Sequence, residues 1–315
     1  MLACLLSSPP SATLPAMALL RRLVRVSVFM PAMLGAQAPP PGPIDDEALV
    51  RTIEARCATL LAEGKLARLD DLHAAPPPTE VALGLAPART ARLEPEEVYT
   101  LGRASAVLVG VYYHCEECDA WHFDAASGVA LTKEGAVATC WHVLERDPER
   151  ADARGVIADY EGRVWPVRAV LAANVQADVC IVATDARELV PMPLRVGARV
   201  GERVFCLSNP DHRFGFFSEG LLARWFVDRE PPPDDEKEAS TRALQPGWPA
   251  FEVTLDFAQG SSGAAILDRA GNAVALAQAT QTIVTGAVDE PGDVQMVVKV
   301  AAPAAALQAL IRAPK

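Results

Sequence analysis

The sequence has few aromatic residues and no excess of positive charge. Only 6% of its 315 residues are aromatic, and the net charge is −11 at pH 7. Nucleic acids and anionic membrane surfaces attract basic proteins, so neither is an expected partner. No internal repeat of fixed period occurs. Half of the residues are hydrophobic, which is enough for a sizeable core.

The N-terminal segment lacks an apolar run long enough for an ordinary transmembrane helix, but it has the features of a secretory signal. Met17–Arg25 is basic, Val26–Leu34 is a short apolar stretch, and Ala36-Gln37-Ala38 fits the small-x-small rule for cleavage. Pro39 directly follows this site, so cleavage after Ala36 and an uncleaved anchor both stay open. We expect export and no stable membrane insertion after cleavage.

The next part of the chain is predicted to be a linker followed by helices. Pro39–Pro43 is proline-rich. Apolar residues recur at helical spacing over Asp45–Leu72, with acidic residues in the first turn, which predicts one helix. Pro95 suits the first turn of a second helix that ends near Arg103. We interpret this region as an extension that packs on the following domain.

From about Ala104 onward, the pattern changes to short β-branched or apolar runs separated by turn residues. This pattern predicts an all-β domain. The Ala/Leu-rich residues 301–312 predict a closing helix. The predicted strands are Ala106–Tyr113, Ala136–Cys140, Val164–Leu171, Val179–Ala183, Arg203–Leu207 and Phe251–Leu255.

One stretch among these strands, Asp228–Pro249, is rich in acidic residues and proline. It has no apolar periodicity, so we interpret it as a mobile surface loop. Its place before the last predicted strand leaves two roles open, a specificity or regulatory element of the cleft and a solvated insertion.

Three short segments supply a histidine, an aspartate and a serine, in that order. His142 follows Thr-Cys-Trp, Asp178 lies in Ala-Asp-Val-Cys-Ile, and Ser262 lies in Gly-Ser-Ser-Gly-Ala. A serine hydroxyl becomes a good nucleophile when an imidazole takes its proton, and an acid must orient that imidazole. Gly260 accepts a positive φ, which lets the N–H groups of Gly260 and Ser262 point into one cavity as an oxyanion hole.

Two neighbouring residues are reserve candidates. Asp185 lies past the strand that follows Asp178, so it is less well placed as the acid. Ser261 does not lie in a Gly-x-Ser-Gly motif, whereas Ser262 does. That motif lets the hydroxyl and the main-chain N–H of the same serine point in one direction. We therefore predict a triad of His142, Asp178 and Ser262.

These segments resemble the chymotrypsin-type serine proteases, and among them the bacterial Deg/HtrA-like branch. Residues 126–143 resemble the strand–turn–strand segment that precedes the catalytic histidine in that branch. Ser208-Asn209-Pro210 resembles its Gly-Asn-Pro stretch, and Leu267–Val274 resembles the hairpin after its nucleophile. The resemblance implies two six-stranded antiparallel β-barrels with the catalytic cleft between them, over about 104–195 and 196–300. Because the chain stops at Lys315, we expect no PDZ module.

The expected organisation is a signal peptide (1–38), a linker with a helical extension (39–103) and a trypsin-like protease domain (104–315). The resemblance implies an exported, periplasmic or secreted bacterial serine endopeptidase without a cofactor, which cleaves unfolded or misfolded envelope polypeptides. It leaves homo-oligomer formation open. The alternative is a catalytically weak, protease-fold binding or chaperone-like module, because Trp141 and Ala264 depart from the usual pattern near the chemistry.

Substrate preference and one cysteine pair allow alternatives. Asp256 lies six residues before Ser262, where trypsin-like relatives carry the acid that selects Lys or Arg. Deg/HtrA-like relatives imply small aliphatic side chains instead, and that is the preference we expect.

The pair Cys115-Glu-Glu-Cys118 is flanked by His114 and His122. In an oxidising compartment the spacing suits a disulfide, which we expect first. Zinc bound by Cys115, Cys118 and His122 is the alternative, with no obvious fourth ligand beyond His114. The other cysteines of the mature chain are expected to be small buried hydrophobes; they are Cys57, Cys140, Cys180 and Cys206.

Overall fold

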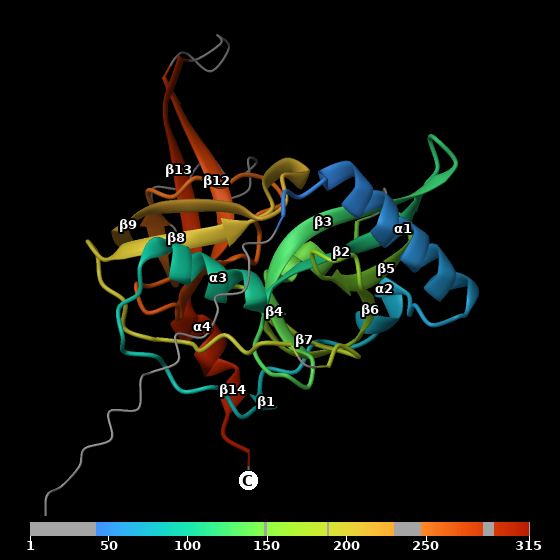
Figure 1. Cartoon of the computed structure of the whole chain (residues 1–315), viewed down its shortest axis with the longest axis horizontal. Coiled ribbons are helices and arrows are strands. Elements are labelled where there is room, and N and C mark those ends of the chain that lie inside the picture. The colour runs from blue at the N-terminus through green and yellow to red at the C-terminus, as the bar shows by residue number, and fades with distance from the viewer. Residues whose placement is uncertain (1–41, 148–149, 188, 230–246, 286–292, 315) are drawn as a thin grey trace, which may run out of the picture. The chain divides into compact units, whose positions relative to one another are not determined.

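A computed structural model describes residues 42–147, 150–187, 189–229, 247–285 and 293–314 (Figure 1). The predicted signal peptide and most of the predicted acidic loop lie outside the described residues. None of the described helices is long and apolar enough to cross a membrane.

Two closed antiparallel barrels dominate the described chain (Figure 1). The first barrel has the strand order β2-β3-β4-β7-β6-β5. Its strands are β2 (Ala106–Cys115), β3 (Ala120–Ala130), β4 (Ala136–Thr139), β5 (Ala151–Ala158), β6 (Val164–Asn174) and β7 (Val179–Thr184).

The second barrel has the order β10-β13-β12-β11-β8-β9. The fold class predicted from the sequence, all-β with two six-stranded barrels, is confirmed. The strands are β8 (Arg203–Ser208), β9 (Phe216–Asp228), β10 (Trp248–Val253), β11 (Ala265–Leu267), β12 (Ala273–Thr285) and β13 (Asp293–Pro303).

The N-terminal extension forms two helices where the sequence predicted one. Helix α1 (Asp46–Ala62) is capped by Asp45, whose carboxylate accepts the N–H of Ala48 at 2.9 Å. It ends early because the N–H groups of Gly64 and Lys65 bond back to Leu61 and Leu60, as in a Schellman cap. The short α2 (Leu69–Leu72) follows, so a continuous helix over Asp45–Leu72 is wrong.

Helix α3 (Pro95–Ser105) begins at the predicted proline. The closing helix α4 (Ala304–Ala309) is shorter than predicted, because residues 301–303 belong to β13 and pair with β12. After α4, β14 (Ile311–Arg312) pairs in parallel with β1 (Val81–Ala82).

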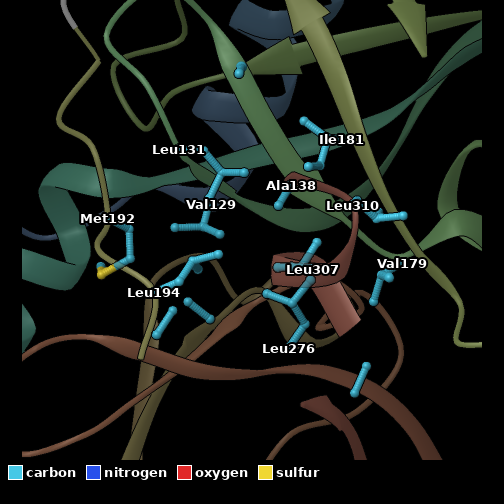
Figure 2. Close-up of a cluster of buried hydrophobic side chains, with 14 of the residues drawn as sticks. Val129, Leu131, Ala138, Val179, Ile181, Met192, Leu194, Leu276, Leu307 and Leu310 are labelled. Atoms are coloured by element: carbon cyan, nitrogen blue, oxygen red, sulfur yellow. The ribbon is translucent and has the colours of Figure 1, made fainter. Parts of the chain in front are cut away.

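A hydrophobic cluster joins the two barrels (Figure 2). Val129, Ala138 and Ile181 come from the first barrel and Leu276 from the second. Leu307 of α4 is buried among them. Burial of apolar surface stabilises the junction by about 25 cal/mol per Å². The cluster thus sets how the loops of one barrel face the loops of the other.

Candidate active site

The predicted histidine lies on a short 3₁₀ helix, η1 (Trp141–Leu144), directly after β4. Residues 136–140 are buried in the first barrel, which anchors the start of η1. The side chain of His142 is 43% exposed, so its ring is accessible to a substrate.

Asp178 holds this histidine through both carboxylate oxygens. Oδ2 lies 2.7 Å from Nδ1 of His142, and Oδ1 accepts the main-chain N–H of His142 at 2.9 Å. Asp178 itself has φ 52° in the turn before β7, a conformation that aspartate tolerates better than most side chains. The N–H of Trp141 bonds to its carbonyl at 3.3 Å, which ties the turn to η1.

The serine comes from the second barrel, in the turn between β10 and β11. Ser262 Oγ lies 2.9 Å from His142 Nε2. A carboxylate only accepts hydrogen bonds, so Nδ1 of His142 carries a proton toward Asp178, and Nε2 accepts from the serine hydroxyl. A competing acceptor, the carbonyl of Gln278, lies farther from Oγ at 3.3 Å. The structure therefore brings the three predicted residues together in one hydrogen-bonded chain.

Two glycines let the serine turn approach the first barrel. A Cβ on Gly263, at φ 86°, would lie 2.3 Å from both the Ser127 carbonyl and Thr139 Oγ1. A Cβ on Gly260, at φ 87°, would lie 2.5 Å from the carbonyl oxygen of Asn209. Both positions therefore require glycine.

The N–H groups of Gly260 and Ser262 have no hydrogen-bond partner among the described residues. The turn around them is closed by the Ser261 N–H, which donates to the Ala258 carbonyl at 3.0 Å. Two free N–H donors beside a nucleophile suit the developing negative charge of an acyl-transfer reaction.

Burial and charge act in opposite directions on His142. Burial lowers the pKa of the imidazole, whereas the hydrogen bond and charge of Asp178, with the charge of Glu145, raise it. The net pKa lies above the ordinary value of 6.5. Asp178 and Glu145 thus stabilise the charged imidazole that forms when His142 receives a proton during the reaction.

A buried hydrogen-bonded chain supports the serine turn, and sequence reasoning missed its role. The hydroxyl of Ser127 donates to the Gly260 carbonyl and accepts from Asn209 Nδ2, both at 2.9 Å. The hydroxyl of Tyr160 donates to Asn209 Oδ1 at 2.9 Å. Ser127 and Asn209 are 2% and 1% exposed. Asn209 was noted only in the Ser-Asn-Pro resemblance, and no local pattern connects Tyr160 with the site.

A cavity of about 180 Å³ lies beside Ser262. Asp256 is exposed and does not line it. The ammonium group of Lys299 donates a hydrogen bond to the carbonyl of Phe257, which lines the cavity. Lys299 is also the cross-strand partner of Thr280, another lining residue. The cavity is lined by Phe257, Ala258, Gln259, Ser262, Gln278, Ala279 and Thr280.

Neither of the two departures from the family pattern lines the cavity. Trp141 is 7% exposed, packs in the core of the first barrel and donates through Nε1 to Glu145 at 3.2 Å. Ala264 is buried in the core of the second barrel. Of the reserve candidates, Asp185 pairs with Arg168, which lowers the pKa of its carboxyl, and Ser261 is fully buried.

Four of the described cysteines are buried, as expected from the sequence. Cys57, Cys140, Cys180 and Cys206 are fully buried. Cys115 and Cys118 are free thiols at the end of the β2–β3 hairpin, and Cys118 Sγ lies 2.9 Å from His122 Nε2. The predicted disulfide is not formed in this structure.

The double barrel with this loop geometry defines a chymotrypsin-type fold. Residues 126–276 match the model of the trypsin-like peptidase domain. This part of the chain is thus similar to trypsin-like peptidases, in agreement with the chymotrypsin-type fold and with the resemblance seen in the sequence. No curated protein matches the chain.

The comparison with solved structures returns HtrA-type proteases, of which one reaches a TM-score of 0.50. The HtrA-type protease AlgW with decapeptide is similar at a TM-score of 0.50 and 17% identity, covering 69% of this chain and 66% of that one. The serine endoprotease from Yersinia pestis is similar at a TM-score of 0.47 and 15% identity, covering 70% of this chain and 65% of that one. The chain therefore spans slightly less than two thirds of the length of these proteins.

Proposed function

We propose that the protein is a serine endopeptidase that cleaves polypeptides through an acyl-enzyme. The observation that carries this proposal is the continuous chain from Ser262 Oγ through His142 to Asp178, at 2.9 and 2.7 Å. Such a chain supplies the nucleophile, its base and the group that orients the base.

In the proposed reaction, Ser262 Oγ attacks the scissile carbonyl while His142 Nε2 takes the hydroxyl proton. The N–H groups of Gly260 and Ser262 stabilise the resulting oxyanion. Collapse breaks the peptide bond, and His142 returns the proton to the leaving amine. Water then attacks the ester with His142 as base, which releases the acid and restores the serine. Asp178 keeps the imidazole tautomer and stabilises its charged form.

The cavity beside Ser262 supports a substrate class. The cavity beside Ser262 is small and is lined by no charged side chain among the described residues. We infer that it accepts small uncharged side chains. The structural neighbour AlgW is described with a decapeptide, which supports polypeptides as substrates. Export is part of the proposal and is supported by the signal-like N-terminal segment. Action on unfolded or misfolded envelope proteins is also proposed, from the sequence resemblance alone.

The alternative, a weakly active binding module, is less well supported. It was based on Trp141 and Ala264, and both side chains are buried in barrel cores.

Casein cleavage by the purified protein tests the proposal. The wild type should degrade casein, and Ser262→Ala should abolish the cleavage. A wild type that binds unfolded casein without cleaving it would instead favour the binding module.

A further inference from the structure

The tip of the β2–β3 hairpin carries a cluster of metal-binding side chains that the proposed reaction does not use. Cys115, Cys118 and His122 each offer one ligand atom, and these atoms all lie within 4.8 Å of one another. We propose that this cluster binds one Zn²⁺ ion. The proposal is independent of the peptidase function.

Strand register places two of the ligands on one face. Tyr113 lies opposite His122, and directly opposed residues of an antiparallel pair project to the same face. Cys115 is two residues from Tyr113 on the same strand, so it shares that face as well. The side chains of Cys115 and His122 therefore converge without any change in the backbone.

The turn between the strands brings in the third ligand. Residues 116–119 connect Cys115 to Ala120, and Cys118 Sγ lies 2.9 Å from His122 Nε2. Zinc bonds are about 2.3 Å to sulfur and about 2.0 Å to nitrogen, so tetrahedral ligand atoms stand roughly 3.5 Å apart. The Cys118–His122 separation is shorter than that spacing and all three ligand atoms lie within 4.8 Å of one another, so small side-chain rotations would seat the ion.

The ligand set matches zinc chemistry. Two thiolates and an imidazole suit Zn²⁺, whereas Mg²⁺ and Ca²⁺ prefer oxygen ligands. On binding, each thiol releases its proton to solvent and His122 binds as the neutral imidazole. Cys118 is exposed, which leaves the fourth position to water.

His114 belongs to the opposite face and is not a ligand. It lies opposite Trp121 in the strand register, with the two ring centroids 5.6 Å apart. Its Nε2 lies 3.2 Å from Asp119 Oδ1. His114 therefore provides a matched control, because it is a histidine of the same hairpin that faces away from the cluster.

A disulfide between Cys115 and Cys118 is the competing state. It would give no use to the His122 imidazole, whose Nε2 lies against the Cys118 sulfur at 2.9 Å. Zinc uses all three side chains, which is why the geometry favours the ion.

The test uses the full chain, reduced, freed of metal and kept anaerobic. After incubation with Zn²⁺ and desalting, elemental analysis should find one zinc per wild-type and His114→Gln chain. Cys118→Ser and His122→Gln should each retain far less. Co²⁺ should give a thiolate charge-transfer band in wild type and His114→Gln. The band should be weak or absent in Cys118→Ser and His122→Gln. Circular dichroism checks that every variant is folded.

Thermal unfolding gives a second readout. A ligand that binds only the folded state raises the Tm, so zinc should do so for wild type and His114→Gln alone. The proposal is overturned if reduced wild type binds no zinc, or if Cys118→Ser and His122→Gln retain it. Protein isolated from its native compartment with a complete Cys115–Cys118 disulfide and no zinc would also overturn it.

Discussion

His142 donates two hydrogen bonds to Asp178, one from ring Nδ1 at 2.7 Å and one from its main-chain N–H at 2.9 Å. The ring bond sets the tautomer, and the main-chain bond ties the aspartate to the start of η1. A single carboxylate thus fixes both the orientation of the imidazole and the backbone that carries it.

Asp178→Asn should therefore lower kcat strongly while the protein stays folded, because asparagine also tolerates the positive φ of this residue. Its amide would donate to Nδ1 and move the imidazole proton to Nε2, where it blocks acceptance from Ser262. We expect a loss of about 10⁴-fold in kcat, against about 10⁶-fold for Ser262→Ala or His142→Ala. Steady-state kinetics with a short peptide ester measures the kcat of each variant relative to the wild type. A wild-type rate in Asp178→Asn would remove Asp178 from the mechanism.

The rate should depend on the pKa of His142. The base must be neutral, so kcat/KM rises with pH and its inflection reports the pKa in the free enzyme. That inflection should lie above 6.5, because Asp178 and Glu145 raise the pKa more than burial lowers it. Glu145→Gln removes one raising charge and should move the inflection to lower pH while leaving the triad in place. An inflection below 6.5 in the wild type would contradict the electrostatics described.

Ser127 should act as a positioning residue for the oxyanion turn. Ser127→Ala removes the donor to the Gly260 carbonyl, a bond typically worth about 1 kcal/mol, so kcat should fall about fivefold to tenfold with little change in KM. Tyr160→Phe is the milder control, because Asn209 Oδ1 still accepts the Gly215 N–H at 3.1 Å. If Ser127→Ala lowered the Tm but left kcat unchanged, the bond would be structural only.

Lys299 should discourage basic side chains at the cleavage site. Burial lowers the pKa of its ammonium and the charge of Asp256 raises it, so the two groups interact electrostatically. We expect peptides with Ala or Val at the cleaved position to have higher kcat/KM than those with Lys or Arg. Lys299→Met should uncover the Asp256 charge and raise relative turnover of basic peptides, and adding Asp256→Asn should cancel that gain. A wild-type preference for Arg at the cleaved position would contradict this prediction and would support Asp256 as the acid that selects Lys or Arg.

The barrels and the reacting residues were predictable because their signals are local. Short β-branched runs mark strands, and His142, Asp178 and Ser262 each lie in a short motif with a distinct turn geometry. The break after α1 was missed because the apolar spacing continues to Leu72, whereas the cap at Gly64 ends the helix. Residues 301–303 were assigned to a helix because alanine favours helices, but pairing with β12 overrides that preference.

The hydrogen bonds that support the serine turn could not be predicted from the sequence, for a different reason. Ser127, Tyr160 and Asn209 come from distant parts of the chain and meet only where the barrels join. Nothing in the spacing of one segment shows that its serine will bond to a carbonyl 133 residues away. Such contacts depend on how the two cores pack, which no local pattern encodes.

The most direct test of the account is the site of covalent labelling by a fluorophosphonate probe. The probe should label the folded protein on one residue, and peptide mass spectrometry should assign it to Ser262. Ser261→Ala should still be labelled at Ser262, because Ser261 is fully buried and its hydroxyl accepts the Ala258 N–H at 3.2 Å. Ser262→Ala and His142→Ala should not be labelled. Labelling of Ser261, or of Ser262 equally in the absence of His142, would contradict the proposed triad.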